Sequence, residues 1–366
     1  MTAGASVNVA DVTLYRYTSE QLRNLCEVAG FEKSDNTPLQ LLKELLGPAG
    51  TRPLSDGPLW PSDVADDATP VEFSLAFDSS GGRAIRVLGE TINGKPSPEA
   101  NAEAAKQLLA TLAERFRLPL DRYHAVADLF LPQQPQGKFS LWFSLIFRPH
   151  SPPRVKVYFN PEVQGVGRAR ELVASGLRRL GIAHAYDTVE KHALRRGELD
   201  RFSFFAFDLD DGPAARLKLY VSHFSAMPED VEHAARAVSG VDPALVSEFC
   251  SVIGGSGPFT GRPLVSSYSF VEDGGGSPGN YSLYLPIRSY TSDDKVARTR
   301  VLELMRSRGL DEADLDAAIR AVSRRQLADN VGLIPHVSLR AGRFDSGITV
   351  YLSSEAFAVT PVPLAT

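Results

Sequence analysis

The sequence predicts an α+β fold in which five antiparallel β-hairpins, separated by helices, close into a ten-stranded barrel with the helices outside. Three observations support this prediction. A short alternating segment that ends in tyrosine occurs four times along the chain. Each copy follows another alternating segment across a turn rich in glycine, aspartate or proline, which is a hairpin signal. Helical segments separate the hairpins, and the tight turns exclude a parallel arrangement of strands.

The four repeated segments place charged and phenolic side chains on one strand face. They read Val155-Lys156-Val157-Tyr158, Leu217-Lys218-Leu219-Tyr220, Tyr281-Ser282-Leu283-Tyr284 and Ile348-Thr349-Val350-Tyr351. Their tyrosines lie 62, 64 and 67 residues apart (220−158, 284−220, 351−284), so each repeat contains more than one strand. Because residues i and i+2 share a face, Lys156 and Lys218 point the same way as the tyrosines that follow them. Ten strands enclose room for a ligand, whereas about eight only just fill with side chains.

The predicted elements follow one another in a regular order. Residues 1–67 are expected to form a helical entry and a loop, 68–355 the barrel repeats and 356–366 a tail, all within one domain. The predicted hairpins pair 71–77 with 83–88, 139–147 with 155–159, 202–209 with 215–221, 264–271 with 281–286, and 336–339 with 348–352. Their predicted turns are 79–82, 149–153, 210–212, 274–279 and 342–347.

Apolar periodicity and capping residues predict the helices. In the entry, Thr18 or Ser19 is expected to cap a helix with Leu22 and Leu25 on its apolar face, and a second helix, 38–46, is expected to stop at Gly47. The later helices are predicted over 98–116, 163–180 (opened by Pro161), 186–196, 229–239, 243–253, 292–308 and 312–329.

The composition excludes several classes of protein. The chain has 366 residues, of which 43% are hydrophobic and 23% charged, as in a soluble globular protein. A net charge of −5 argues against a nucleic-acid partner. With only Cys26 and Cys250, the chain is expected to lack a zinc site and disulfides and to be cytoplasmic. Residues 1–12 do not resemble a signal peptide, and no stretch of about 18 apolar residues predicts a membrane helix.

One strand carries the pattern most clearly. Arg216, Lys218 and Tyr220 alternate with Leu217 and Leu219, so burying the leucines under helices turns the polar groups inward. Cations arranged in this way suit an anionic ligand, and four converging tyrosines offer π-faces to a carbocation. The alternatives are solvated cations on the outer face and ordinary core tyrosines.

Other motifs give weaker signals. Asp208, Asp210 and Asp211 lie where a hairpin turn is predicted and do not form a DDxxD motif, so we interpret them as turn residues. The glycines at 274–276 lack the GxxxxGK[ST] pattern of a phosphate-binding loop. His223 and His336 lack a nucleophile motif and are interpreted as structural or substrate-lining residues.

The recurrence of Lys-x-Tyr after hairpins, with Glu72 and Arg86 in the first repeat, resembles the ABBA (α-β-β-α) aromatic prenyltransferases. More closely, it is similar to the bacterial members of the indole, or dimethylallyltryptophan synthase, family. The resemblance covers nearly the whole chain after about Pro70. It implies a barrel of five α-β-β-α repeats and a metal-independent enzyme without a cofactor. It also implies a role in secondary metabolism such as alkaloid biosynthesis, a monomer or homodimer, and no membrane partner.

The same resemblance implies the reaction and the roles of single residues. A dimethylallyl group would pass from dimethylallyl diphosphate to the indole of L-tryptophan or a close derivative, by electrophilic aromatic substitution through an allyl cation. By this resemblance, the cations that bind the diphosphate are Arg86, Lys156, Arg216 and Lys218. The tyrosines that shield the allyl cation are Tyr158, Tyr220, Tyr284 and Tyr351, and the last three of them also contact the diphosphate. The indole is bound by Glu72 and Trp142. Glu72, Lys156 and the four tyrosines are the predicted catalytic residues.

Two departures from the family pattern concern the site. Ser282 stands where a glutamine is frequent, and the stretch Ser140-Leu141-Trp142-Phe143-Ser144 lacks the lysine that many C4-prenylating members carry as a proposed base. The resemblance therefore implies attack at C5, C6, C7 or N1 rather than at C4.

Glu72 alternates with apolar neighbours, so an inward carboxylate needs a partner. An indole N–H would serve, and an ion pair to Arg83 or Arg86 is the alternative. Two other functions remain open at this point: prenylation of another aromatic acceptor, for which Glu72 would be dispensable, and a non-catalytic barrel that binds hydrophobic ligands.

Overall fold

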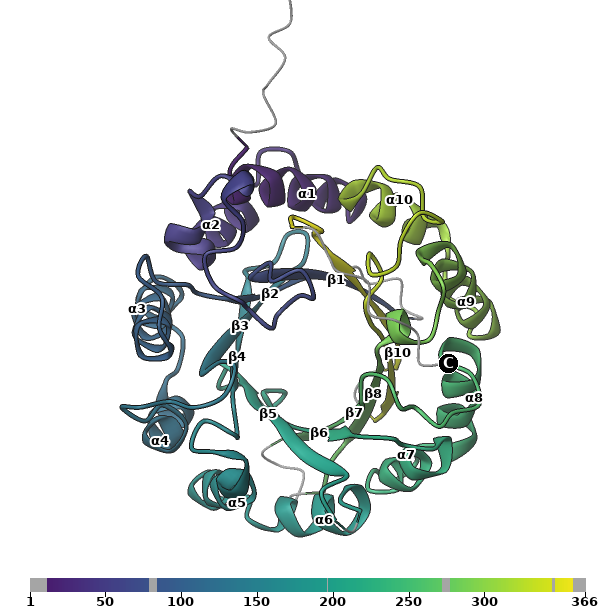
Figure 1. Cartoon of the computed structure of the whole chain (residues 1–366). Helices are drawn as coiled ribbons and strands as arrows, with labels where there is room; N and C mark the ends of the chain where they lie inside the picture. The colour runs from purple at the N-terminus through teal and green to yellow at the C-terminus, as the bar shows by residue number, and fades with distance from the viewer. Residues whose placement is uncertain (1–11, 79–83, 196, 272–276, 344–345, 358–366) are drawn as a thin grey trace, which may run out of the picture.

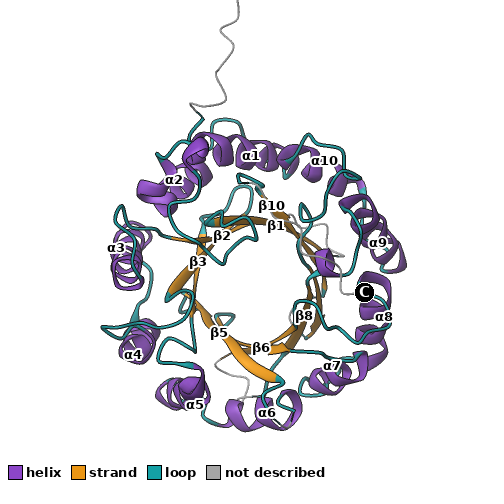
Figure 2. Cartoon of the chain, viewed as in Figure 1, coloured by secondary structure: helices purple, strands orange, loops and turns teal. Residues whose placement is uncertain are grey.

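Within residues 12–78, 84–195, 197–271, 277–343 and 346–357, which the computed structural model describes, ten antiparallel strands close into one barrel. The helices form a ring around it (Figure 1; Figure 2). Each strand pairs with its neighbours in sequence, and β1 pairs with β10 to close the barrel. The predicted fold class is therefore confirmed.

The strands form five hairpins. They are β1 (Val71–Phe77), β2 (Ala84–Glu90), β3 (Leu141–Phe147), β4 (Arg154–Phe159), β5 (Asp200–Asp208), β6 (Arg216–His223), β7 (Leu264–Val271), β8 (Asn280–Leu285), β9 (Val337–Gly342) and β10 (Gly347–Ser353). They agree with the predicted hairpins to within a few residues. Parts of three predicted turns, 79–82, 274–276 and 344–345, lie outside the described residues.

A pair of helices precedes each hairpin in the described part of the chain. The helices are α1 (Leu14–Val28), α2 (Thr37–Gly50), α3 (Pro98–Phe116), α4 (Asp121–Phe130), α5 (Ala169–Arg179), α6 (His184–Ala193), α7 (Pro228–Ala235), α8 (Pro243–Ile253), α9 (Asp294–Ser307) and α10 (Ala313–Val322). Predicted helices 98–116 and 243–253 match α3 and α8 at both ends. None of these helices combines the length and the hydrophobicity that crossing a bilayer requires.

Two of the predicted helix starts are wrong. The side chain of Thr13 caps α1, and Thr18 lies inside that helix, where its hydroxyl donates to the carbonyl of Leu14 at 2.8 Å. Between β4 and α5 the backbone turns at Gly165, whose φ is 92°, so the helix begins at Ala169 rather than near 163.

Other helix predictions were incomplete or too long. Helix α4 was not predicted, although Tyr123, Val126 and Phe130 form its buried stripe. Helix α10 ends at Val322, because the next residue, Ser323, adopts extended backbone angles. The predicted stop at Gly47 appears as a kink inside α2.

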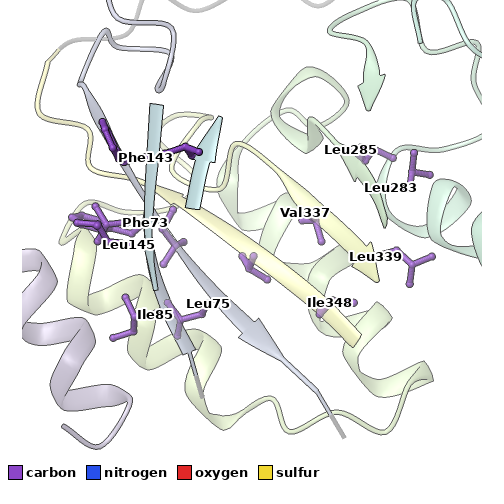
Figure 3. Packing of buried hydrophobic residues seen from close by; sticks show 14 of the residues in the cluster. Phe73, Leu75, Ile85, Phe143, Leu145, Leu283, Leu285, Val337, Leu339 and Ile348 are labelled. Atoms are coloured by element: carbon purple, nitrogen blue, oxygen red, sulfur yellow. The ribbon is translucent and has the colours of Figure 1, made fainter. Parts of the chain in front are cut away.

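The hydrophobic core lies between the barrel and the helix ring. Alternate strand residues such as Phe73, Ile85 and Phe143 point outward into it and are fully buried, as Figure 3 shows for part of the layer. Burying each such side chain stabilises the fold by roughly 1.5–3 kcal/mol. Helix α2 packs so closely on β2 that a Cβ at Gly89 would lie 2.5 Å from Leu45. This outer layer leaves the other strand face, with its polar residues, for the barrel interior.

Candidate active site

A cavity of about 550 Å³ lies inside the barrel, within the range of small-molecule sites. The residues that line it include Glu72, Ser74, Arg86, Trp142, Ser144, Tyr158, Arg201, Phe204, Tyr220, Arg262, Tyr284, His336 and Tyr351. They come from the inward face of the strands and from the loops at one end of the barrel. The predicted tyrosines, the glutamate, the tryptophan and one of the predicted cations therefore share one chamber.

The four predicted tyrosines form a continuous chain across the cavity. Ring centroids are 5.8 Å apart between Tyr158 and Tyr220, 5.7 Å between Tyr220 and Tyr284, and 6.0 Å between Tyr284 and Tyr351. Burial raises the pKa of Tyr158, Tyr220 and Tyr351, so these phenols are neutral at physiological pH. Their π-faces present partial negative charge to the space between them.

The predicted cations also converge. Lys156 and Lys218 are almost fully buried on the inward face of β4 and β6. Burial lowers the pKa of Lys218 well below its ordinary value, and the nearby Lys156 and Arg216 lower it further. In the described part of the chain Lys218 makes no hydrogen bond or ion pair. A buried lysine side chain without a counter-ion marks a place for an anion, whose negative charge favours the ammonium form.

Asp208 is not the turn residue that the sequence predicted. It ends β5 facing inward, 4% exposed, and its carboxylate lies 3.0 Å from Lys156 Nζ and 3.1 Å from Arg216 Nε. Burial alone would raise the pKa of Asp208, but Lys156 and Arg216 hold it below its usual range. The ion pair fixes two of the cations, yet even with Asp208 present burial lowers the pKa of Lys156 to about 8. By contrast, Asp210 does cap the turn, accepting from the backbone N–H of Gly212 at 2.9 Å.

One further inward cation was missed. Along β9, every second residue points inward, which places Arg340 on the same face as His336 and Ser338. On the neighbouring strand β8, Ser282 is its pairing partner. Its Nη2 donates to the carbonyls of Phe77 and Ile348 at 3.0 and 3.2 Å. The alternation along β9 was the available signal for its orientation.

Glu72 is 5% exposed and lines the cavity. Burial raises its pKa well above the ordinary value, Asp66 raises it further, and Arg262 opposes this. The alternative ion pair with Arg86 does not form: the Arg86 guanidinium donates instead to Thr349 Oγ1 at 3.3 Å. Arg83 lies outside the described residues. Among the described residues, then, no hydrogen bond or ion pair occupies the Glu72 carboxyl.

Trp142 belongs to an aromatic wall beside Tyr158. Its ring stacks on Phe139 with centroids 4.0 Å apart and lies 5.5 Å from Phe204. Phe204 meets Tyr158 edge-on at 6.0 Å. This wall offers a flat apolar surface next to the tyrosine chain, on which an aromatic ring can stack.

The cavity mouth carries charged groups that sequence reasoning did not single out. The guanidinium of Arg201 lies 5.5 Å from the ring of Phe224, and its Nε has no hydrogen-bond partner among the described residues. Arg262 pairs with Asp66, which also pairs with Arg288. Arg201 was missed because its alternation is interrupted by a β-bulge between residues 202 and 204.

The two histidines have different surroundings. His336 lines the cavity, with its ring 6.2 Å from that of Tyr351. His223 points outward under the helices, between Asp200 at 2.7 Å and Ser266 at 2.9 Å, and is fully buried. His223 is therefore a structural residue, remote from the cavity lining.

A loop at the mouth is held by Glu90, whose carboxyl accepts from Ser62 Oγ at 2.6 Å. Burial raises the pKa of Glu90 from 4.5 to about 7, although Ser62 and Trp142 both lower it. The folded state therefore binds this proton more tightly than the unfolded chain does. Between about pH 4.5 and 7 the free energy of unfolding should fall as pH rises, by about 3 kcal/mol.

We expect Glu90→Gln to remove that part of the pH dependence. The variant should unfold with wild-type stability at pH 5 and be more stable than wild type at pH 8, as measured by urea unfolding. The exposed Glu114→Gln on α3 is the matched control. Parallel pH profiles for both variants would contradict the assignment of the proton to Glu90.

Within the described residues, no three His, Cys, Asp or Glu side chains gather in a way that would hold a metal ion.

Comparisons with a family model and with solved structures both find tryptophan-prenylating enzymes. A family model described as tryptophan dimethylallyltransferase matches residues 15–246. The 6-dimethylallyltryptophan synthase of Micromonospora olivasterospora, solved in complex with DMASPP and Trp, is 49% identical with a TM-score of 0.92, covering 96% of this chain and 100% of that one. The 5-dimethylallyltryptophan synthase of Streptomyces coelicolor is 37% identical with a TM-score of 0.89, covering 96% and 100%.

A curated fungal protein is more distant. Deoxybrevianamide E synthase from Aspergillus versicolor is 26% identical over 192 residues, which are 45% of this chain and 43% of that protein. The aligned segment spans less than half of either chain.

Proposed function

The chain belongs to the tryptophan dimethylallyltransferase family, and we propose that it transfers a dimethylallyl group from dimethylallyl diphosphate to C6 of the indole ring of L-tryptophan. The observation that carries this proposal is the buried side chain of Lys218, unpaired among the described residues, beside a chain of four tyrosines. Cations without counter-ions call for a polyanion, and converging π-faces call for a cation.

The cations act on the leaving group. Lys218 and Arg86 have no carboxylate partner among the described residues, whereas Asp208 pre-orients Lys156 and Arg216. Diphosphate adds about three negative charges, which these groups neutralise without a metal. As the C–O bond breaks, charge grows on the bridging oxygen, and the fixed cations stabilise the transition state more than the ground state.

The tyrosines act on the allyl cation. Each neutral ring contributes about 0.5–2 kcal/mol of cation–π stabilisation, more where water is excluded. The chain of Tyr158, Tyr220, Tyr284 and Tyr351 also shields the cation from water, which would trap it as an alcohol. We expect the hydroxyls of the last three to contact the diphosphate as well.

Glu72 positions the indole. Its carboxylate accepts the N1–H, which raises electron density on the ring, while Trp142 and Phe204 supply a wall for stacking. The allyl C1 then forms a bond to the ring carbon, and loss of the ring proton restores aromaticity.

One observation argues against attack at C4, and a second favours C6 over C5. The inward-facing residues of β3 include Trp142 and Ser144, and this strand lacks the lysine that would act as the base for attack at C4. The 6-dimethylallyltryptophan synthase is also more similar in sequence than the 5-dimethylallyltryptophan synthase, at 49% against 37% identity.

The test is product identification. Incubation with tryptophan and dimethylallyl diphosphate should yield 6-dimethylallyltryptophan, identified by mass spectrometry and NMR, with stoichiometric diphosphate release that EDTA leaves unchanged. Binding of prenyl compounds without diphosphate release would instead indicate a carrier. Release with a phenol but not with tryptophan would indicate another acceptor.

The surroundings of Arg201 support an acceptor that carries an amino-acid group. Its guanidinium lines the mouth with an unsatisfied Nε–H, which suits the α-carboxylate of tryptophan. We expect Arg201→Gln to raise KM for tryptophan about 10- to 100-fold, the worth of one charge-assisted hydrogen bond. KM for dimethylallyl diphosphate should not change.

Tryptamine, which lacks the carboxylate, provides the matched comparison: wild type and Arg201→Gln should use it equally well. The exposed Arg324→Gln is the control variant. If Arg201→Gln lost tryptamine and tryptophan turnover alike, Arg201 would have another role.

A further inference from the structure

Prenylation of the ring ends with loss of a proton, and this step needs an acceptor inside the cavity. The requirement rests on the proposed function. Bond formation at the ring carbon gives an arenium ion, in which that carbon still carries its hydrogen. Because an arenium ion is a strong acid, even a weakly basic group takes this proton, provided that its lone pair reaches the carbon.

Few groups that line the cavity offer such a lone pair. Lys138 and the arginines carry only N–H donors, and Tyr158, Tyr220 and Tyr351 are neutral phenols. Asp63 is half exposed at the mouth and paired with Lys138 at 2.8 Å. Glu162 comes from the loop after β4, three strands around the barrel from Glu72 on β1. Two other titratable groups line the cavity: Glu72, which holds the indole N–H in the proposed function, and His336.

His336 has the position and the protonation state of a base. It precedes β9, its ring lies edge-on to Tyr351 at a centroid distance of 6.2 Å, and among the described residues nothing is hydrogen-bonded to its ring nitrogens. Burial lowers the pKa of His336 to about 4, with Asp66 raising it and Arg262 and Arg288 lowering it. The imidazole is therefore neutral at physiological pH, with one nitrogen lone pair free.

Glu72 lies on β1 and His336 directly before β9, and these two strands flank β10 in the barrel. Asp66 and Arg262 are among the charges that act on both groups. In indole, C6 and C7 lie on the same edge as N1, whereas C4 lies on the opposite edge. An acceptor near the group that holds N1–H therefore reaches C6 more readily than C4.

We propose that His336 is the catalytic base that removes the proton from the prenylated ring carbon. The allyl C1 forms its bond with two π electrons of the ring, and diphosphate has left with the electron pair of the C–O bond. The imidazole lone pair then binds the ring proton, and the C–H electron pair restores the aromatic sextet. The negative charge of Asp66, which raises the pKa of His336, favours the imidazolium until the proton passes to water at the mouth.

An isotope experiment separates a base from a structural residue. In wild type, C–C bond formation is expected to limit the rate, so tryptophan deuterated on the indole ring should react as fast as ordinary tryptophan. In His336→Asn, kcat should fall about 10- to 100-fold, and proton loss should become rate-limiting. A primary deuterium isotope effect should then appear, and added imidazole should partly restore the rate.

His336→Gln provides a second variant if the first folds poorly, with far-UV circular dichroism as the check. His150→Asn is the matched control, because His150 is exposed in a hairpin turn at a φ of 57°, which asparagine tolerates. A wild type that makes no prenyltryptophan would refute the proposed function. A wild type that makes it, with His336 variants that react at the wild-type rate or show no isotope effect, would refute only the role of His336 and leave the departing diphosphate as the acceptor.

Discussion

Replacing Lys218 with methionine is expected to lower kcat with dimethylallyl diphosphate by about 10²–10³-fold, the usual cost of removing one preorganised group that stabilises developing charge. The lysine is buried on β6 without a carboxylate partner among the described residues. Methionine keeps its length and apolar stem but has no charge. Turnover measured by diphosphate release should fall, while the KM for tryptophan stays near the wild-type value.

The same variant should not be less stable than wild type. Burial lowers the pKa of Lys218, so the folded state binds its proton less tightly than the unfolded chain, and the charge costs stability below the ordinary lysine pKa. Lys218→Met should therefore melt at or above the wild-type temperature in the absence of ligand. Diphosphate should raise the melting temperature of wild type and have less effect on the variant.

Lys33→Met is the control, because Lys33 is 84% exposed. If Lys218→Met kept full turnover and the full thermal response to diphosphate, the cation cluster would not be the diphosphate site.

The fold was predictable because its signals are local. Alternation such as that of Val71–Phe77, together with turn residues, identifies a hairpin within about twenty residues. Five such hairpins have no unpaired edge strand only if the sheet closes into a barrel, as it does here. The errors came where one residue decides a boundary. The left-handed Gly165 delays α5, and Thr13 rather than Thr18 caps α1. Such choices depend on tertiary contacts that a single-sequence pattern does not contain.

The site was predictable where the alternation of side chains along a strand decides which of them face the barrel interior. This alternation correctly placed Lys218 and the four tyrosines in the interior, although their chemical roles stay predictions. The same alternation places Asp208 inward, but its neighbours Asp210 and Asp211 suggested a turn instead. The ion pair of Asp208 with Lys156 joins two different hairpins, so a local pattern does not reveal it. Arg201 directly precedes a bulge that shifts the register of β5, so alternation along the strand did not identify it.

Glu72 distinguishes an indole acceptor from other aromatic acceptors. Its carboxyl is buried, lines the cavity and has no partner among the described residues, and burial raises its pKa well above the ordinary value. A protonated carboxyl does not accept the N1–H as strongly as a carboxylate does. In wild type, kcat/KM for tryptophan should therefore rise with pH through the raised pKa of Glu72, rather than level off near the ordinary glutamate value.

Glu72→Gln is expected to lower kcat/KM for tryptophan by about 10²–10³-fold, because it removes both a charge-assisted hydrogen bond and the negative charge that activates the ring. The acidic limb of the pH profile should disappear with it. 1-Methyltryptophan has no N1–H and gives the matched comparison: wild type should use it poorly, and the substitution should cost little more. An equal loss with both acceptors would mean that Glu72 supports the cavity wall rather than the indole, and would favour an acceptor of another class.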